Sequence, residues 1–237
     1  YLCFLGDLTA LQARLAPELP PLPALPADRI ELARASRMPP IDRAALASDP
    51  AMHDTLARFC TEAEALDMPD AARQALQAVS AAGIADRHWL LTNVLSDTIP
   101  DDSVAPHLFV GAAVQLHLTR LAATLDPAKL VPIRVGVCPC CGGKPATSSV
   151  MGTAGIENVR YATCASCATQ WNEVRIKCLC CGSNKSISYR SVETEDATVK
   201  AELCGECHSW VKILYQVKNH SLEAVADDVA SLGLDLL

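Results

Sequence analysis

Aromatic residues are scarce in this chain of 237 residues: only 4% are Phe, Trp or Tyr, although 50% are hydrophobic. The apolar content is therefore carried by Ala, Leu and Val, which favours packed helices over a β-sandwich. Long apolar runs are lacking too, because the longest stretch without a formal charge, 103–119, contains two His and one Gln. It falls short of the roughly 20 apolar residues of a membrane helix, so we expect no direct membrane insertion.

Basic residues are also fewer than acidic ones. Lys and Arg number 20 against 27 Asp and Glu, which gives a formal net charge of -7. Non-specific nucleic-acid binding depends on clustered Lys and Arg that neutralise phosphates, so we expect no nucleic-acid partner. The sequence further lacks a general acid–base pair, a nucleophile elbow, a P-loop and a dinucleotide fingerprint. We therefore expect that the protein is not an enzyme.

The first part of the chain, 1–132, is predicted to be an all-helical domain. The chain starts at Tyr1 without Met and is already in helical periodicity, so we expect that it begins inside a longer protein. The Pro-rich run 19–26 forbids a continuing helix and is predicted to be a linker. Helices are expected over 1–16, from Asp49-Pro50 to about Leu66, from Pro69 onward, over 86–94 as a buried segment, and over 106–125 with Phe109, Ala112, Ala113, Leu116, Leu121 and Leu125 on one face.

After Pro132 the pattern changes to short alternating stretches that are typical of hairpin strands. A last helix is expected over 220–237, capped by Ser221 and with Asp227 and Asp228 on its solvated side. Strands are expected over 133–137, 159–164, 171–176, 186–192 and 210–215.

Cysteine, in contrast, is abundant and ordered. Ten of the 12 Cys lie from Cys138 to Cys207, and eight of them form four Cys-x-x-Cys pairs. A shift of 40 positions moves the first two pairs onto the last two, which indicates an internal duplication. The pairs are Cys138/Cys141, Cys164/Cys167, Cys178/Cys181 and Cys204/Cys207.

Each copy reads Cys-x2-Cys-x22-Cys-x2-Cys, the spacing of a four-thiolate metal site built from two facing turns. A Gly follows the first pair of each copy, Gly142 and Gly182, and can adopt the positive φ that lets backbone N–H groups point at sulfur. A copy that closes its own site could have folded before duplication. This favours one site per copy, although a cross-braced pairing stays open.

Three other interpretations compete with two metal sites. Cys-x-x-Cys pairs at a fixed repeat are atypical of a disulfide framework, and a thioredoxin-like role needs a βαβ context that is missing here. The stretch from Cys204 to His208 matches the haem attachment signature, but Ala168 stands at the duplicated position, so His208 is outside the repeated plan. The remaining cysteines are expected to be non-ligands: Cys140, Cys180, Cys3 and Cys60.

Four protein thiolates leave no open coordination position, so such a site is structural if it holds zinc and redox-active if it holds iron. Spacing alone allows either metal. A zinc-ribbon binding module and an electron-transfer protein are therefore both open alternatives at this point.

The stretch from Cys138 to the C-terminus resembles a known family, the formate dehydrogenase accessory proteins of the FdhE type. Cys140 and Cys180 depart from the family plan, which does not need them. The resemblance rests on Cys-Pro-Cys-Cys-Gly at 138–142, Arg-Tyr-Ala-Thr-Cys-Ala-Ser-Cys at 160–167, Val-Arg-Ile-Lys-Cys at 174–178, Lys-Ala-Glu-Leu-Cys-Gly-Glu-Cys at 200–207 and Val-Lys-Ile-Leu-Tyr-Gln at 211–216.

This resemblance implies an α+β protein: an all-helical N-terminal domain (1–132), two tandem rubredoxin-like or zinc-ribbon-like metal modules (133–177 and 178–219) and a C-terminal helix (220–237). It implies a cytoplasmic, chaperone-like maturation factor that binds the formate dehydrogenase catalytic subunit before export. Two iron ions, one per site, are implied, with zinc as the alternative. The implied metal ligands are Cys138, Cys141, Cys164, Cys167, Cys178, Cys181, Cys204 and Cys207.

Overall fold

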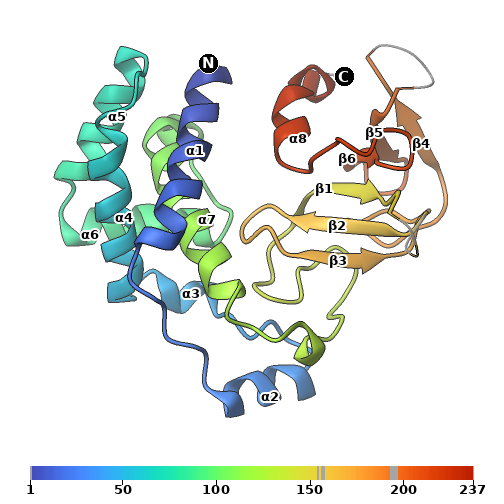
Figure 1. Cartoon of the computed structure of the whole chain (residues 1–237), viewed down its shortest axis with the longest axis horizontal. Coiled ribbons are helices and arrows are strands. Elements are labelled where there is room, and N and C mark those ends of the chain that lie inside the picture. Colours follow the sequence, from blue (N-terminus) through green and yellow to red (C-terminus); the bar gives the residue numbers. More distant parts are fainter. Residues whose placement is uncertain (1, 154, 156–157, 193–196, 237) are drawn as a thin grey trace. The chain divides into compact units, whose positions relative to one another are not determined.

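The computed structural model describes residues 2–153, 155, 158–192 and 197–236. The chain forms two compact units, a helical unit made of Tyr1–Leu32 and Pro40–Lys129 and a sheet unit made of Ala33–Pro39 and Leu130–Leu237. Figure 1 traces this order from helices to strands along the sequence. In the part of the chain described here, no helix is both long and apolar enough to cross a membrane.

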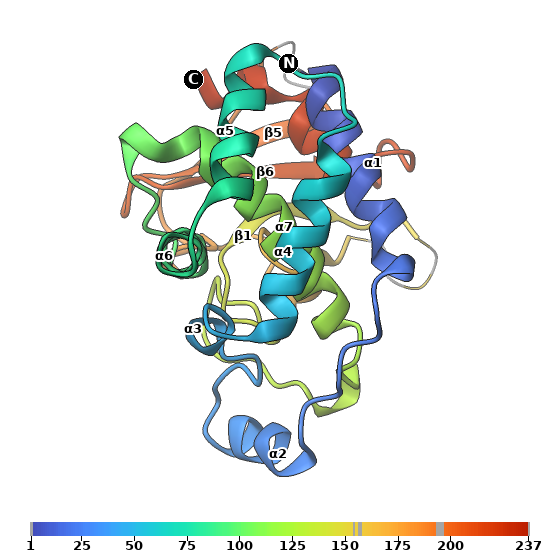
Figure 2. The ribbon, with the colours of Figure 1, turned by 90° about the vertical axis from the view of Figure 1, so that its left-hand side faces the viewer.

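The helical unit is built around one central helix, α7, which packs against α1, α4, α5 and α6. Figure 2 looks onto this unit, with α4 and α7 running side by side. Its elements are α1 (Leu2–Glu18), α2 (Ala27–Ala35, which crosses into the sheet unit), α3 (Arg43–Leu46), α4 (Pro50–Ala63), α5 (Asp70–Ala81), α6 (Ile84–Leu95), η1 (Asp101–Ser103), α7 (Val104–Ala122) and η2 (Pro127–Lys129).

The apolar face predicted for 106–125 forms the core of this unit. All six of its predicted residues are buried, and Phe109 is fully so, with its ring against Phe4 of α1 at a centroid distance of 6.1 Å. Each buried Leu or Phe side chain of this face contributes on the order of 1.5–3 kcal/mol when it leaves water. The predicted Asp49 cap is confirmed as well, because its carboxylate accepts a hydrogen bond of 2.8 Å from Ala51 N–H at the start of α4.

Other helix predictions need correction. The predicted buried segment 86–94 is only half-buried, since Leu90 and Leu91 are buried but Trp89 is 47% exposed. Helix α2 was not expected, and Ala33 is its only buried residue, so it carries no apolar stripe that periodicity could detect. The four-residue α3 was also not expected; its signal is Asp42, whose carboxylate accepts from Ala45 N–H.

The sheet unit holds one six-stranded sheet with the strand order β3-β2-β1-β6-β5-β4. Neighbouring strands are antiparallel within each duplicated copy, and the two copies meet at a parallel pair, β1 with β6. The copies therefore share a continuous sheet. The strands are β1 (Pro145–Val150), β2 (Arg160–Cys164), β3 (Gln170–Glu173), β4 (Ile187–Arg190), β5 (Val199–Cys204) and β6 (Trp210–Tyr215).

Four of the five predicted strands are confirmed, as β2, β3, β4 and β6. The prediction over 133–137 is wrong, because that stretch forms a turn in which Val137 N–H donates to Arg134 O. Strands β1 and β5 were missed. Ser and Thr dominate β1 and charged residues interrupt β5, so neither shows a clear apolar alternation.

A buried ion pair connects the strands of the two copies. The Arg160 guanidinium on β2 donates to Glu202 Oε1 on β5 at 2.9 Å, and the two side chains are 0% and 3% exposed. Arg160 also donates to Ser148 Oγ on β1 at 2.9 Å, and Tyr189 on β4 donates to Glu202 Oε2 at 3.2 Å. Cys164 ends β2 and Cys204 ends β5, so this network connects two strands that each end in one cysteine of a different cluster.

The last segment, with α8 (Ala226–Ala230) and η3 (Leu232–Leu236), follows β6. The expected helix is confirmed, but it starts later than predicted, and Leu237 lies outside the described residues. Instead of Ser221, the Glu223 carboxylate accepts from the N–H groups that start α8. Asp228 is only partly solvated, because its carboxylate, 35% exposed, also binds the buried Lys212 ammonium at 2.9 Å, as does Asp235.

Candidate metal centres

The structure brings the eight paired cysteines together in two separate groups of four sulfurs. Within each group all four Sγ atoms lie within 4.8 Å of one another. Each duplicated copy therefore closes its own cluster, as the duplication favours, and the cross-braced pairing is not formed. The first cluster consists of Cys138, Cys141, Cys164 and Cys167; the second consists of Cys178, Cys181, Cys204 and Cys207.

The sulfur spacing fits a tetrahedral thiophilic ion. Metal–sulfur bonds near 2.3 Å at tetrahedral angles place the sulfurs about 3.8 Å apart. In the first cluster, Cys141 Sγ lies 3.6 Å from Cys164 Sγ and 3.4 Å from Cys167 Sγ. In the second cluster, the distance from Cys181 Sγ to Cys204 Sγ is 3.7 Å. Either cluster could thus hold a zinc or iron ion without a change of the backbone.

All four Cys-x-x-Cys turns share one backbone design. In the first turn, Gly142 N–H donates to Cys138 O at 2.9 Å and Cys138 N–H donates to Gly143 O at 3.0 Å. The same two bonds recur in the turns that start at Cys164, Cys178 and Cys204. This repeated geometry follows from the repeated spacing, and it aims both sulfurs of a turn to the same side.

A left-handed residue follows every pair. Gly142 and Gly182 have φ values of 75° and 80°, as their sequence position predicts. Ala168 and His208 occupy the same position with φ of 56°, where no Gly signals it in the sequence. A non-Gly residue in this region costs about 1–2 kcal/mol, so these two turns are held by the rest of the site.

Backbone N–H groups point at sulfur in both clusters. Cys180 N–H lies 3.3 Å from Cys178 Sγ, and Ser166 N–H lies 3.4 Å from Cys164 Sγ. Donors of this kind favour the thiolate form, which is the form that binds metal. These N–H groups therefore compensate part of the negative charge of a four-thiolate centre.

The thiols of the first cluster influence one another strongly. A hydrogen bond with Cys140 raises the pKa of Cys138 to about 12, and the hydrogen bond with Cys138 raises the pKa of Cys141. Hydrogen bonding from Cys138 lowers the pKa of Cys164. Cysteine binds metal as the thiolate, so metal binding at this cluster releases protons.

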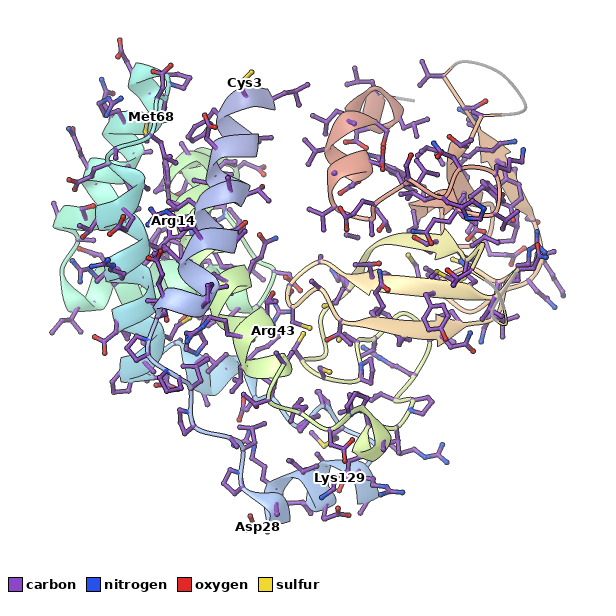
Figure 3. All side chains as sticks on the ribbon, in the orientation of Figure 1. Cys3, Arg14, Asp28, Arg43, Met68 and Lys129 are labelled. Atoms are coloured by element: carbon purple, nitrogen blue, oxygen red, sulfur yellow. The ribbon has the colours of Figure 1, made fainter. Side chains whose placement is uncertain are left out.

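The other cysteines lie outside the clusters. Cys140 is buried and Cys180 is exposed, each in the first turn of its copy. Cys60 lies in the core of the helical unit, where burial raises the pKa of its thiol to about 11. Cys3, in contrast, is exposed on the first turn of α1 (Figure 3).

The backbone at His208 follows the duplicated turn. Its backbone N–H donates to Cys204 O at 3.0 Å, just as Ala168 N–H donates to Cys164 O at 3.2 Å. It therefore occupies the structural position of Ala168. The sulfurs of Cys204 and Cys207 face the other two sulfurs of the second cluster, so a thioether link to haem would break that cluster.

Comparisons with known proteins cover the whole chain. Sequence models for FdhE match successively, with the N-terminal part over residues 1–135, the central domain over 137–175 and the C-terminal domain over 176–237. A relative from Rhizobium meliloti (strain 1021), "Protein FdhE homolog", is 56% identical over 239 residues, which is 100% of this chain and 78% of the relative. Another from Edwardsiella ictaluri (strain 93-146), with the same name, is 33% identical over 99% of this chain and 76% of its own length.

A solved structure shows the same fold. The crystal structure of the FdhE protein from Pseudomonas aeruginosa superimposes with a TM-score of 0.84 at 29% sequence identity. The match covers 97% of this chain and 81% of that one. The similarity thus extends over the helical unit as well as the four-cysteine clusters.

Proposed function

The chain belongs to the FdhE family, and on this premise we propose that it is an accessory factor required for the activity of respiratory formate dehydrogenase. In this proposal it acts in the cytoplasm, where it binds the catalytic subunit of the enzyme before export. It is a chaperone-like binding protein and performs no catalysis of its own. The paired cysteines serve as metal ligands in two tandem modules, 133–177 and 178–219.

The observation that carries the proposal is the pair of four-sulfur clusters on one shared sheet. Metal bound to four thiolates supplies folding free energy to a small unit, and it leaves no open position for a substrate. A rigid, closed centre suits a recognition protein better than an enzyme. We propose iron as the metal, one ion per cluster, with zinc as the alternative. The ligands are Cys138, Cys141, Cys164 and Cys167 in one module and Cys178, Cys181, Cys204 and Cys207 in the other.

The direct test uses a strain that lacks this protein. Formate dehydrogenase activity should be lost in that strain and restored by the full chain. A tagged full chain should also co-purify the catalytic subunit from cells. If the strain without the protein kept full formate dehydrogenase activity, the maturation role would be wrong.

A rubredoxin-like electron-transfer protein is a second candidate. It is supported by the second cluster, in which Cys181 is exposed and Cys207 is half-buried, so electrons could enter close to the surface. This candidate requires iron that is reversibly reduced by a partner. Fast reduction and reoxidation of the purified protein, together with a catalytic subunit that matures normally in the deletion strain, would favour electron transfer over maturation.

A further inference from the structure

The two cysteine clusters arise from one duplicated plan, yet water reaches them differently. All four cysteines of the first cluster are buried. In the second cluster, Cys181 is exposed and Cys207 is half-buried. Their counterparts 40 positions earlier are Cys141 and Cys167, which are 1% and 2% exposed. The same ligand positions are thus closed in one copy and open in the other.

Neighbouring residues explain part of this difference. Pro39, from the short N-terminal stretch of the sheet unit, lies against the first cluster's turn, because a Cβ atom added at Gly142 would be 3.1 Å from Pro39 Cγ. At the counterpart glycine, Gly182, an added Cβ atom would lie 3.5 Å from Lys177 Cε and 3.5 Å from Val135 Cγ2, so the second turn is contacted less closely than the first. Within the turns, Cys140 is buried while its counterpart Cys180 is exposed.

We infer that the second cluster is the site at which metal is exchanged and at which thiol-directed reagents act, while the first cluster keeps its metal. This inference rests on the proposed metal-binding function. A small ligand can remove an ion only where it reaches the ion or its sulfurs, and thiolate reactivity follows exposure. Access is open at Cys181 and Cys207 and closed at the first cluster.

The exchange step balances with a low-molecular-weight thiol as the incoming ligand. Its sulfur replaces the Cys181 sulfur in the coordination shell, and its proton moves to the Cys181 thiolate. The released Cys181 thiol is then free in solvent beside the exposed Cys180. A second replacement at Cys207 leaves Cys178 and Cys204 as the two protein ligands, and two further replacements there release the ion; each replacement returns one proton to a cysteine and none needs an oxidant.

The full chain loaded with zinc provides the first test. Metal analysis must first establish about two zinc ions per chain, as two four-thiolate sites require. Excess glutathione is then added together with the indicator 4-(2-pyridylazo)resorcinol, which binds each zinc ion that leaves the protein and reports it by absorbance. We expect two phases of equal amplitude that differ in rate by on the order of tenfold or more. A single phase for both ions would overturn the inference.

Matched variants assign the phases. Cys181→Ser should remove the fast phase and leave one slowly released ion, whereas Cys141→Ser at the corresponding position should remove the slow phase. The reverse assignment would contradict the inference. A count of fewer than two ions in the wild-type chain would instead count against the proposed metal-binding function, so the two failures are distinguishable.

If Cys141→Ser does not fold, the inference can still be tested by thiol labelling of a chain that keeps all eight paired cysteines. A Cys3→Ser/Cys180→Ser chain, which lacks the two exposed non-ligand thiols, is loaded with zinc and treated briefly with N-ethylmaleimide. Peptide mass spectrometry should find Cys181 and Cys207 modified on the order of tenfold faster than Cys141 and Cys167. Equal labelling of the four cysteines would refute the inference.

Discussion

Glu202 compensates the charge of the buried Arg160 guanidinium, and Glu202→Gln tests how strongly the stability of the sheet unit depends on this compensation. The substitution keeps the shape of the side chain and removes its charge, which leaves the Arg160 guanidinium buried at 0% exposure. Loss of one partner of a buried pair costs about 3–5 kcal/mol. We expect the lower end of this range, about 3 kcal/mol, for two reasons. The amide oxygen of Gln can still accept a hydrogen bond from Arg160. The guanidinium also keeps its three neutral acceptors, which are the carbonyls of Arg175 and Lys177 and Ser148 Oγ.

The assay is urea unfolding of the metal-loaded full chain, followed by tryptophan fluorescence. A Trp89→Phe background removes the tryptophan of the helical unit, so Trp171 and Trp210 report on the sheet unit alone. The matched control is Glu206→Gln, an exposed carboxylate four residues along the chain, which should change the free energy of unfolding by less than about 0.5 kcal/mol.

A loss below about 1 kcal/mol for Glu202→Gln would refute the reasoning, because it would place the pair among weak surface contacts. The double variant Arg160→Met/Glu202→Leu provides a second check. It removes both charges and should recover a large part of the loss, since two apolar groups avoid the cost of an isolated buried charge.

Three further predictions concern other parts of the chain. Ala168→Gly should raise the free energy of unfolding by about 0.5–1 kcal/mol because it relieves the positive φ of 56°, and a loss in urea unfolding would contradict this. Burial lowers the pKa of His117, so below about pH 6.5, its ordinary pKa, the unfolded chain binds more protons than the folded chain and the free energy of unfolding should fall. His117→Gln should reduce this dependence of the free energy of unfolding on pH, measured by unfolding curves from pH 5 to 8. An unchanged pH dependence would contradict the prediction. Lys212→Met removes the partner of Asp228 and Asp235 and should destabilise the segment 226–236 by about 1–3 kcal/mol. Amide hydrogen exchange over 226–236 should become faster. Unchanged exchange would show that these ion pairs do not stabilise the segment.

The sequence predicted the parts of the fold that local rules determine. Apolar spacing located α7, the Asp49 cap located α4, and the Cys-x-x-Cys repeat gave the two clusters. The duplication also predicts the two strands that alternation missed. A shift of 40 positions moves β2, 160–164, onto 200–204, which is most of β5. The same shift backwards carries β4, 187–190, onto 147–150 within β1. Duplication was the stronger signal there, because alternation is weak in both strands.

Long-range pairing could not be predicted in this way. The parallel contact of β1 with β6 joins residues that are far apart in the sequence, and nothing in either strand specifies the other. The Arg160–Glu202 pair is not part of the repeat either, because Lys200 and Ala162 stand at the corresponding positions. Such polar contacts depend on the assembled sheet, so they become visible only when the strands are in place.

The exposure of the second cluster shows the same limit. The spacing of the four pairs is identical in both copies, so the sequence predicts two equal sites. Whether Cys141 or Cys181 meets solvent depends on what packs against each turn, and a stretch as distant as Pro39 contributes to this. Equal motifs therefore need not give equally protected sites.

Metal analysis with a visible absorption spectrum of protein purified without oxygen would show whether the eight paired cysteines form two metal centres. We expect about two metal ions per chain, and sulfur-to-iron charge-transfer bands if the metal is iron as proposed. Two zinc ions in a colourless protein would keep the two centres and contradict the choice of iron. A chain that folds fully with less than about one ion bound would contradict the two metal centres themselves.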